Sequence, residues 1–247
     1  MANKADGCGG SGSHSIAGYE YQIDVSVWLA LDLVLANRLT LELVLEPVSE
    51  EDVEADLADV EPGRLTSTAA LDGYRLVVQA KLRGGDAWTV AGVKALLKHG
   101  VARPSAAKRL EDKNIRYLLV TSASLNGGTR GLLVRRAGSW PKAADMPATI
   151  KSALPVGSAA RVAIIGNEDK ERITTDIKTL LTESFRVPNA KLDECRQALR
   201  EAARVRIGGA GGGCWTRAQL EQVTRQYRGC EQRCRSDQFR DTSWDDG

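Results

Sequence analysis

The sequence contains no long hydrophobic run. Its longest apolar stretch, Val25 to Leu35, is interrupted by Asp32, and it falls short of the roughly 20 residues that span a bilayer. The segment from Met1 to Ser13 is polar, is rich in glycine and serine, and lacks the apolar core of a secretory signal. These absences argue against an integral membrane protein, and we expect no membrane partner and a cytoplasmic location.

Cysteine and histidine are scarce. The five cysteines are odd in number and absent from the centre of the chain, which argues against a disulfide framework. The cysteines that a zinc site would need are Cys195, Cys214, Cys230 and Cys234. Their spacing lacks the usual paired short loops, and neither histidine lies nearby in the sequence. We therefore interpret Cys195 as a small apolar residue on a helix.

The remaining composition is that of an ordinary globular chain. Hydrophobic residues make up 43% of the 247 residues and charged residues 27%, which is typical of proteins with a buried core. This length accommodates one domain of catalytic size and a small appendage.

The net charge of +2 hides an asymmetry along the chain. Residues 39–63 contain nine acidic residues and no lysine or arginine, whereas residues 75–142 contain fourteen basic residues and three acidic ones. An acidic cluster suits a hard divalent cation, and a basic neighbour suits a phosphate backbone. The alternative is that both segments are simply solvated faces of a sheet.

Hydrophobic periodicity predicts an α/β fold. Helical spacing is expected over residues 15–37, 90–98, 105–112, 130–136, 171–183 and 192–205. Strand character is expected over residues 39–48, 52–60, 74–82, 116–121 and 161–165. This order predicts a mixed β-sheet flanked by helices.

The sequence predicts four regions. Residues 1–14 are expected to be a disordered tail, residues 15–166 a catalytic-size domain, residues 167–228 a small C-terminal helical appendage, and residues 229–247 an unstructured tail. Within the appendage, Gly208 to Gly213 is predicted to be a linker, and Thr216 is predicted to cap a last helix.

Three polar residues form the principal candidate site. Asp52 is placed at the beginning of one predicted strand, and Gln79 and Lys81 lie two residues apart on the next strand, so the latter two share a face. A carboxylate and an amide oxygen that converge there can share a divalent cation. A lysine beside them can position the attacking water and stabilise negative charge on a phosphate.

This arrangement resembles the PD-(D/E)xK, or restriction-endonuclease-like, superfamily, in its Mrr-like branch, where glutamine replaces the usual acidic residue. The matching segments are Gly18-Tyr19-Glu20-Tyr21-Gln22, Glu46, Glu51-Asp52-Val53 and Val78-Gln79-Ala80-Lys81. Together they look like the nuclease domain of bacterial antiphage effectors, in which such a domain precedes a SAVED sensor or a STAND-type ATPase. The similarity covers about residues 15–165.

The resemblance implies a role for each matching residue. Asp52 becomes the principal ligand of Mg²⁺ or Mn²⁺, Gln79 the second ligand and Lys81 the catalytic lysine. Gln22, or alternatively Glu20, would complete the site from the first helix. Glu46 is a further candidate metal ligand. Because Asp52 follows two glutamates, the inward-facing carboxylate is uncertain by one or two positions.

The function implied is a metal-dependent DNA endonuclease, acting as an effector domain in antiphage defence. We expect double-stranded DNA as substrate, weak activity of the chain alone, and a homo-oligomer in the active state. We also expect a C-terminal sensor module or a partner protein, because the chain could be a truncated part of a larger protein. Three alternatives stay open: a nucleic-acid-binding or oligomerisation module of the same fold without catalysis, RNA cleavage, and Gln79 and Lys81 as exposed edge-strand positions. Trp88 is expected either in the core or beside substrate.

Overall fold

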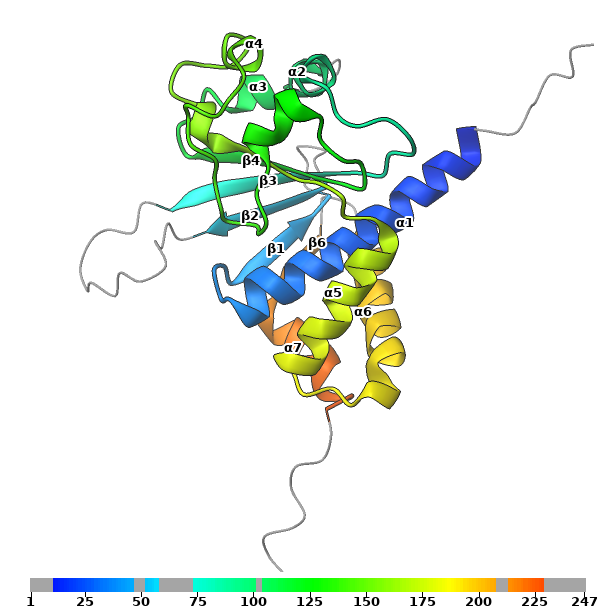
Figure 1. Cartoon of the computed structure of the whole chain (residues 1–247). Coiled ribbons are helices and arrows are strands. Elements are labelled where there is room, and N and C mark those ends of the chain that lie inside the picture. The colour runs from blue at the N-terminus through cyan, green and yellow to red at the C-terminus, as the bar shows by residue number, and fades with distance from the viewer. Residues whose placement is uncertain (1–10, 47–51, 58–72, 101–103, 208–212, 229–247) are drawn as a thin grey trace, which may run out of the picture.

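The computed structural model describes residues 11–46, 52–57, 73–100, 104–207 and 213–228. Its centre is an open, mixed six-stranded sheet in the order β5-β4-β3-β2-β1-β6 (Figure 1). The strands are β1 (Glu42–Leu45), β2 (Val53–Leu57), β3 (Tyr74–Lys81), β4 (Ile115–Thr121), β5 (Val162–Ile165) and β6 (Gly213–Thr216). The predicted α/β class, with a mixed sheet flanked by helices, is confirmed.

The sheet has a parallel half and an antiparallel half. Strands β3, β4 and β5 run parallel, with Gln79 level with Leu119, whereas β1 pairs antiparallel with both β2 and β6. Parallel neighbours need crossover connections, and the segments around α2 (Val90–Lys98), α3 (Ala106–Arg109) and α4 (Ala148–Lys151) supply them. The β3 strand lies where the two halves join.

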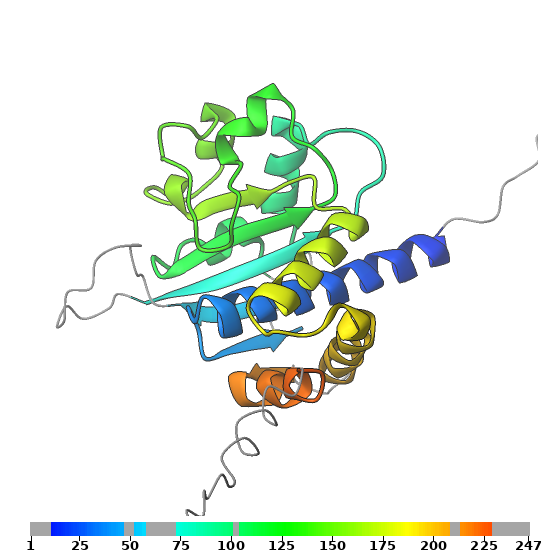
Figure 2. The same cartoon turned by 60° about the horizontal axis from the view of Figure 1, so that its bottom comes forward.

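Helices cover the sheet on both faces (Figures 1 and 2). One core lies between the sheet and the helices α1 (Ser11–Leu29), α5 (Lys170–Glu183) and α6 (Leu192–Ile207). The second core lies under α2, α3 and α4. Because side chains alternate along a strand, Leu76 and Val78 of β3 enter the first core while Val77 enters the second.

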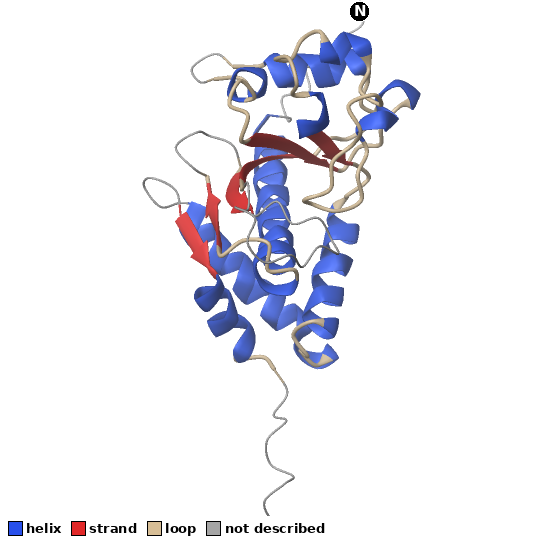
Figure 3. Ribbon diagram, turned by 90° about the vertical axis from the view of Figure 1, so that its left-hand side faces the viewer, coloured by secondary structure: helices blue, strands red, loops and turns tan. Residues whose placement is uncertain are grey.

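The first helix is the longest element, and it continues into the π-helical turns of η1 (Ala30–Ala36). Almost every residue from Tyr21 to Leu35 is buried, because the helix lies between the sheet and α5 and α6 (Figure 3). It begins at Ser11, so the predicted tail ends four residues earlier than expected. Residues 1–10 and 229–247 of the predicted tails lie outside the described residues.

The C-terminal helices complete the first core. Helix α5 contributes Ile173 and Ile177, and α6 contributes Cys195 and Leu199, all fully buried against α1. Cys195 is therefore the buried apolar residue that we predicted. The segment predicted to be an appendage thus packs into the same core as residues 15–166.

The sixth strand was not predicted. Residues 208–212 of the predicted linker lie outside the described residues, but Gly213 belongs to β6, which pairs with β1 so that Trp215 lies opposite Leu43. Trp215 is fully buried. Next to it, Thr216 caps α7 (Arg217–Arg225) in a capping box with Gln219, as the sequence predicted for its cap.

Two shorter elements also differ from prediction. The helix expected over 130–136 is a 3₁₀ helix, η2 (Gly127–Leu132), because Leu133 leaves the helical path to form a parallel bridge with Ile164 of β5. The remaining short turns are η3 (Ala159–Arg161) and η4 (Asn189–Lys191). Within the described residues, no helix is both long and apolar enough to cross a membrane.

Candidate active site

Asp52 lies where β1, β2 and β3 meet. Its backbone N–H donates to the carbonyl of Val78 at 3.1 Å, and its carbonyl accepts from the N–H of Glu46 at 3.1 Å. Its carboxylate oxygen Oδ2 accepts the N–H of Ala80. At the point where β2 begins, the Asp52 carboxylate, in place of a backbone carbonyl of β2, therefore accepts the hydrogen bond from β3. This bond fixes the carboxylate beside the Gln79-Ala80-Lys81 segment.

The protonation of Asp52 is finely balanced. The surroundings together raise the pKa of its carboxyl from 3.8 to about 6, with burial as the largest cause and the nearby Glu46 carboxylate as a smaller one. The bond from Ala80 and the ammonium of Lys81 act in the opposite direction. A half-buried carboxylate that a positive charge would stabilise is typical of a metal or catalytic site.

The first helix reaches the same place through Gln22. Its Nε2 donates to Oε1 of Glu46 at 3.2 Å, so the amide oxygen of Gln22 stays available as an acceptor. Glu46 holds a left-handed backbone conformation, with φ of 43°, which is uncommon for a residue other than glycine. The structure thus brings Gln22 and Glu46 together beside Asp52.

Glu20 points to a different contact. Its carboxylate binds Arg200 and, at 2.8 Å, Arg204 of α6. Two residues along a helix turn the side chain by roughly 200°, so Glu20 and Gln22 leave α1 in opposite directions. Of the two residues proposed to complete the site from the first helix, Gln22 lies at the site and Glu20 does not.

Gln79 has a partner that the sequence analysis missed. Its Oε1 accepts the hydroxyl of Tyr117 at 2.6 Å. Tyr117 is buried on β4, and its position two residues before Leu119, the partner of Gln79, puts both side chains on the same face. The alternation of β4 was the available signal. One of the two lone pairs of the amide oxygen is therefore occupied, and one remains for a cation.

Lys81 is the last residue of β3, and its backbone carbonyl is held by a side-chain hydrogen bond. Its carbonyl accepts the hydroxyl of the fully buried Thr121 at 2.9 Å, and that hydroxyl accepts the indole N–H of Trp88 at 3.0 Å. Of the two places expected for Trp88, the structure shows the core: the side chain is buried and supports the end of β3. Lys81 itself is half-buried.

The oxygen donors at this site suit a hard divalent cation. Two carboxylates, Asp52 and Glu46, and the amide oxygen of Gln22 are the ligand types that Mg²⁺ and Mn²⁺ prefer, whereas the amide oxygen of Gln79 faces Tyr117 on the second-core face of β3. The part of the chain that the structure describes contains no group of three or more His, Cys, Asp or Glu residues arranged for a metal. A cation here would therefore depend on amide oxygens and water as well as on carboxylates. Glu50 and Glu51 lie outside the described residues.

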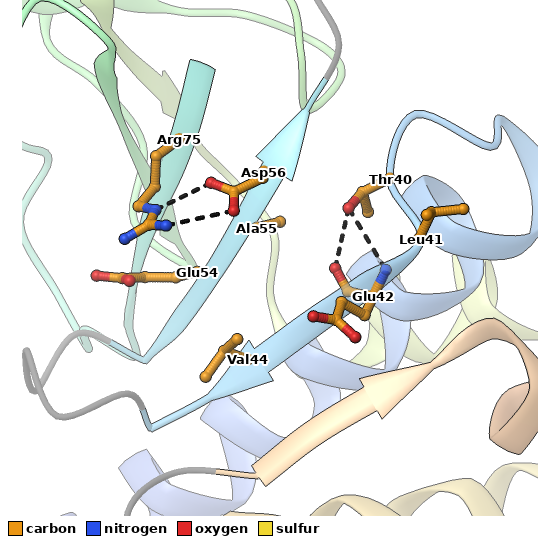
Figure 4. Close-up of a pocket in the computed structure, with 8 residues that line it drawn as sticks. All are labelled: Thr40, Leu41, Glu42, Val44, Glu54, Ala55, Asp56 and Arg75. Carbon is orange, nitrogen blue, oxygen red and sulfur yellow. Dashed lines mark hydrogen bonds and ion pairs between the residues drawn. The ribbon is translucent and has the colours of Figure 1, made fainter. Parts of the chain in front are cut away.

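A pocket lies elsewhere on the sheet (Figure 4). It has a volume of about 380 Å³ and is lined by residues of β1, β2 and β3, but by none of the candidate residues. Asp56 in this pocket is paired with Arg75 through bonds of 2.9 and 3.3 Å, and Glu54 is paired with Arg109. Because these charges neutralise one another, we favour the site at Asp52 on chemical grounds.

Comparison with known proteins gives a fold relationship only. No family model matches the chain, and no curated protein matches it. A solved structure that is similar is the Cap4 SAVED/CARF-domain containing receptor of Moraxella osloensis, with a TM-score of 0.50 and 14% sequence identity. The match covers 83% of this chain and 46% of that receptor's chain, so this chain spans about half the length of the receptor.

Proposed function

We propose that this chain is a metal-dependent endonuclease that hydrolyses DNA phosphodiester bonds. The observation that carries the proposal is the meeting of Asp52, Lys81, Glu46 and Gln22 at the end of β3. This set combines oxygen donors for a hard cation with a lysine, as the resemblance to PD-(D/E)xK nucleases implies.

Each side chain has a task in this proposal. Lys81 stabilises the negative charge that develops on the phosphate and orients the attacking water. Asp52 and Glu46 would hold the cation with the amide oxygens of Gln22 and Gln79. When bound, the cation supplies Lewis-acid activation of the phosphate and of water. The raised pKa of Asp52 means that a cation must displace a proton when the pH lies below about 6.

We further propose that the nuclease is an effector domain in antiphage defence. The fold likeness to a Cap4 receptor that contains a SAVED/CARF domain supports this placement and is compatible with a sensor module as partner. Domains of this kind in the resembling systems act when clustered, so we expect low activity from dilute protein and higher activity in an oligomer.

The direct test is nicking of supercoiled plasmid by the purified chain with Mn²⁺. Asp52→Ala and Lys81→Ala should each lower the rate by about a hundredfold or more, because each removes a group that acts on the charged transition state. Asp56→Ala and Lys98→Ala are matched controls, since both residues are exposed and lie away from the site, and they should leave the rate unchanged. Cleavage that survives both site substitutions would remove the proposal, and the same assay with RNA tests the other substrate.

One observation favours a second candidate, a nucleic-acid-binding or oligomerisation module with weak or no catalysis. In the structure the amide oxygen of Gln79 is bound to Tyr117 and Oδ2 of Asp52 is bound to Ala80, so both proposed ligands are partly engaged by the protein. Calorimetric titration that finds no Mn²⁺ site, together with DNA affinity that falls steeply with salt, would favour this candidate.

A further inference from the structure

The chain beyond Lys81 is held in register with the end of β4. The N–H of Ser122 donates to the carbonyl of Lys81 at 3.4 Å. The N–H of Arg83 donates to the Ser122 hydroxyl at 2.8 Å, and that hydroxyl donates to the carbonyl of Arg83 at 3.0 Å. One serine side chain thus fixes both backbone groups of Arg83, which places this exposed residue at a defined position next to the candidate site.

The guanidinium of Arg83 is also oriented. It lies 4.5 Å from the centre of the Trp88 ring, within the range of a cation–π contact. Trp88 is buried and is held by its bond to Thr121 and by backbone bonds to Ser124 and Asn126. A flexible arginine on such a rigid support loses less conformational entropy when it binds an anion.

The charge of Arg83 is not neutralised by any carboxylate that the structure describes. Within the described ranges no carboxylate forms an ion pair with it, whereas Arg75, Arg109 and Arg200 are each paired. Stacking on an aromatic face leaves the N–H groups at the guanidinium edge free to bind a phosphate in bidentate fashion. Because Arg83 follows Lys81 by two residues, their Cα atoms are at most about 7 Å apart.

We propose that Arg83 is a phosphodiester-binding residue that grips the nucleic-acid backbone beside the phosphate at Lys81. The location of the reacting phosphate rests on the proposed function, but the phosphate contact of Arg83 does not require cleavage. Ser122 and Trp88 act as positioning residues, one for the backbone and one for the guanidinium of Arg83.

The test is equilibrium binding of a labelled non-specific DNA duplex, and of the RNA duplex of the same sequence, without divalent metal and over a range of salt. We expect Arg83→Gln to weaken binding about tenfold and to reduce the slope of log affinity against log salt by about 1. Arg83→Lys keeps the charge and should keep the slope. Arg225→Gln, an exposed arginine at the end of α7, is the matched control and should change neither quantity.

The outcomes separate this inference from the proposed function. If Arg83 only covers Trp88, Arg83→Gln lowers the melting temperature and leaves the salt slope unchanged, which overturns the inference. Failure of the wild-type chain to bind either duplex also overturns it. If Arg83→Gln reduces the salt slope but the wild-type chain does not cleave DNA, the phosphate contact of Arg83 is supported and the nuclease proposal is removed. If the wild-type chain cleaves DNA but Arg83→Gln leaves the slope unchanged, the nuclease proposal stands and the contact of Arg83 is removed.

Discussion

Asp52 illustrates how a functional residue can lower stability. The folded chain raises the pKa of its carboxyl from 3.8 to about 6, so the folded state favours the protonated form. The stability that the protonated carboxyl contributes is therefore fully present below about pH 4 and is lost as the pH rises through about 6. At neutral pH the charge of this half-buried carboxylate costs at most about 3 kcal/mol, and less where solvent screens it, since one pKa unit corresponds to about 1.4 kcal/mol.

We predict that Asp52→Asn stabilises the protein at pH 8 by about 1 to 3 kcal/mol. Asparagine keeps an oxygen that can accept from Ala80 and removes the buried charge, but it also removes the carboxylate that the cation needs. Urea unfolding at pH 8 and pH 4.5 checks this, with the gain expected to shrink at the lower pH. Asp56→Asn, which alters an exposed residue, serves as the control, and a loss of stability in Asp52→Asn at pH 8 would contradict the prediction.

Tyr117 is a residue at the site that the sequence did not predict. Its hydroxyl bond to Gln79 is internal to the sheet, and partners of metal ligands typically contribute ten- to a hundredfold to metal affinity. We predict that Tyr117→Phe weakens Mn²⁺ binding by about tenfold, because the amide of Gln79 then rotates freely. Calorimetric titration measures the effect. Unchanged Mn²⁺ affinity would show that Gln79 is not a ligand.

Between elements, the contact of α1 with α6 depends on buried charges. Asp24 is 3% exposed and Arg200 is 9% exposed, and they form an ion pair, while Glu20 joins Arg200 with Arg204. Removal of one partner from such a network leaves an uncompensated charge in the protein interior. This network attaches the C-terminal helices to the helix that carries Gln22.

We predict that Arg200→Met lowers the free energy of unfolding by about 3 kcal/mol, because Asp24 then lacks its closest partner. Arg204→Met should cost less than about 1 kcal/mol, because its side chain is 27% exposed and screened by solvent. Urea denaturation of both variants gives the comparison. Equal effects of the two substitutions would contradict the importance assigned to burial.

For the whole molecule, the packing predicts that the C-terminal helices cannot be removed. Helices α5 and α6 contribute Ile173, Ile177 and Leu199 to the core under α1, and β6 covers the edge of β1. A chain that ends at residue 166 would expose this apolar surface and the β1 edge to water.

We therefore expect a fragment of residues 1–166 to be unfolded or aggregated, and the full chain to unfold in a single transition. Circular dichroism and size-exclusion chromatography of the fragment test the first statement, and calorimetry of the full chain tests the second. A monomeric, folded fragment would show that residues 167–228 form a separable appendage.

The sequence by itself determined the class of the fold, the position of Gln79 and Lys81 on one strand, and the position of Asp52 directly before the neighbouring strand. These features depend on local alternation of apolar and polar residues, which any strand must show if one of its faces is buried. The cap at Thr216 and the burial of Cys195 were determined in the same local way.

Only the tertiary structure decided which groups meet. The strand β6 has four residues and follows a glycine-rich segment, so its partner β1, about 170 positions earlier, is what makes it a strand. The bond of Tyr117 to Gln79 depends on parallel register, and the choice of Gln22 over Glu20 depends on where α6 packs. These outcomes follow from contacts between distant segments, whose free energy no local pattern encodes.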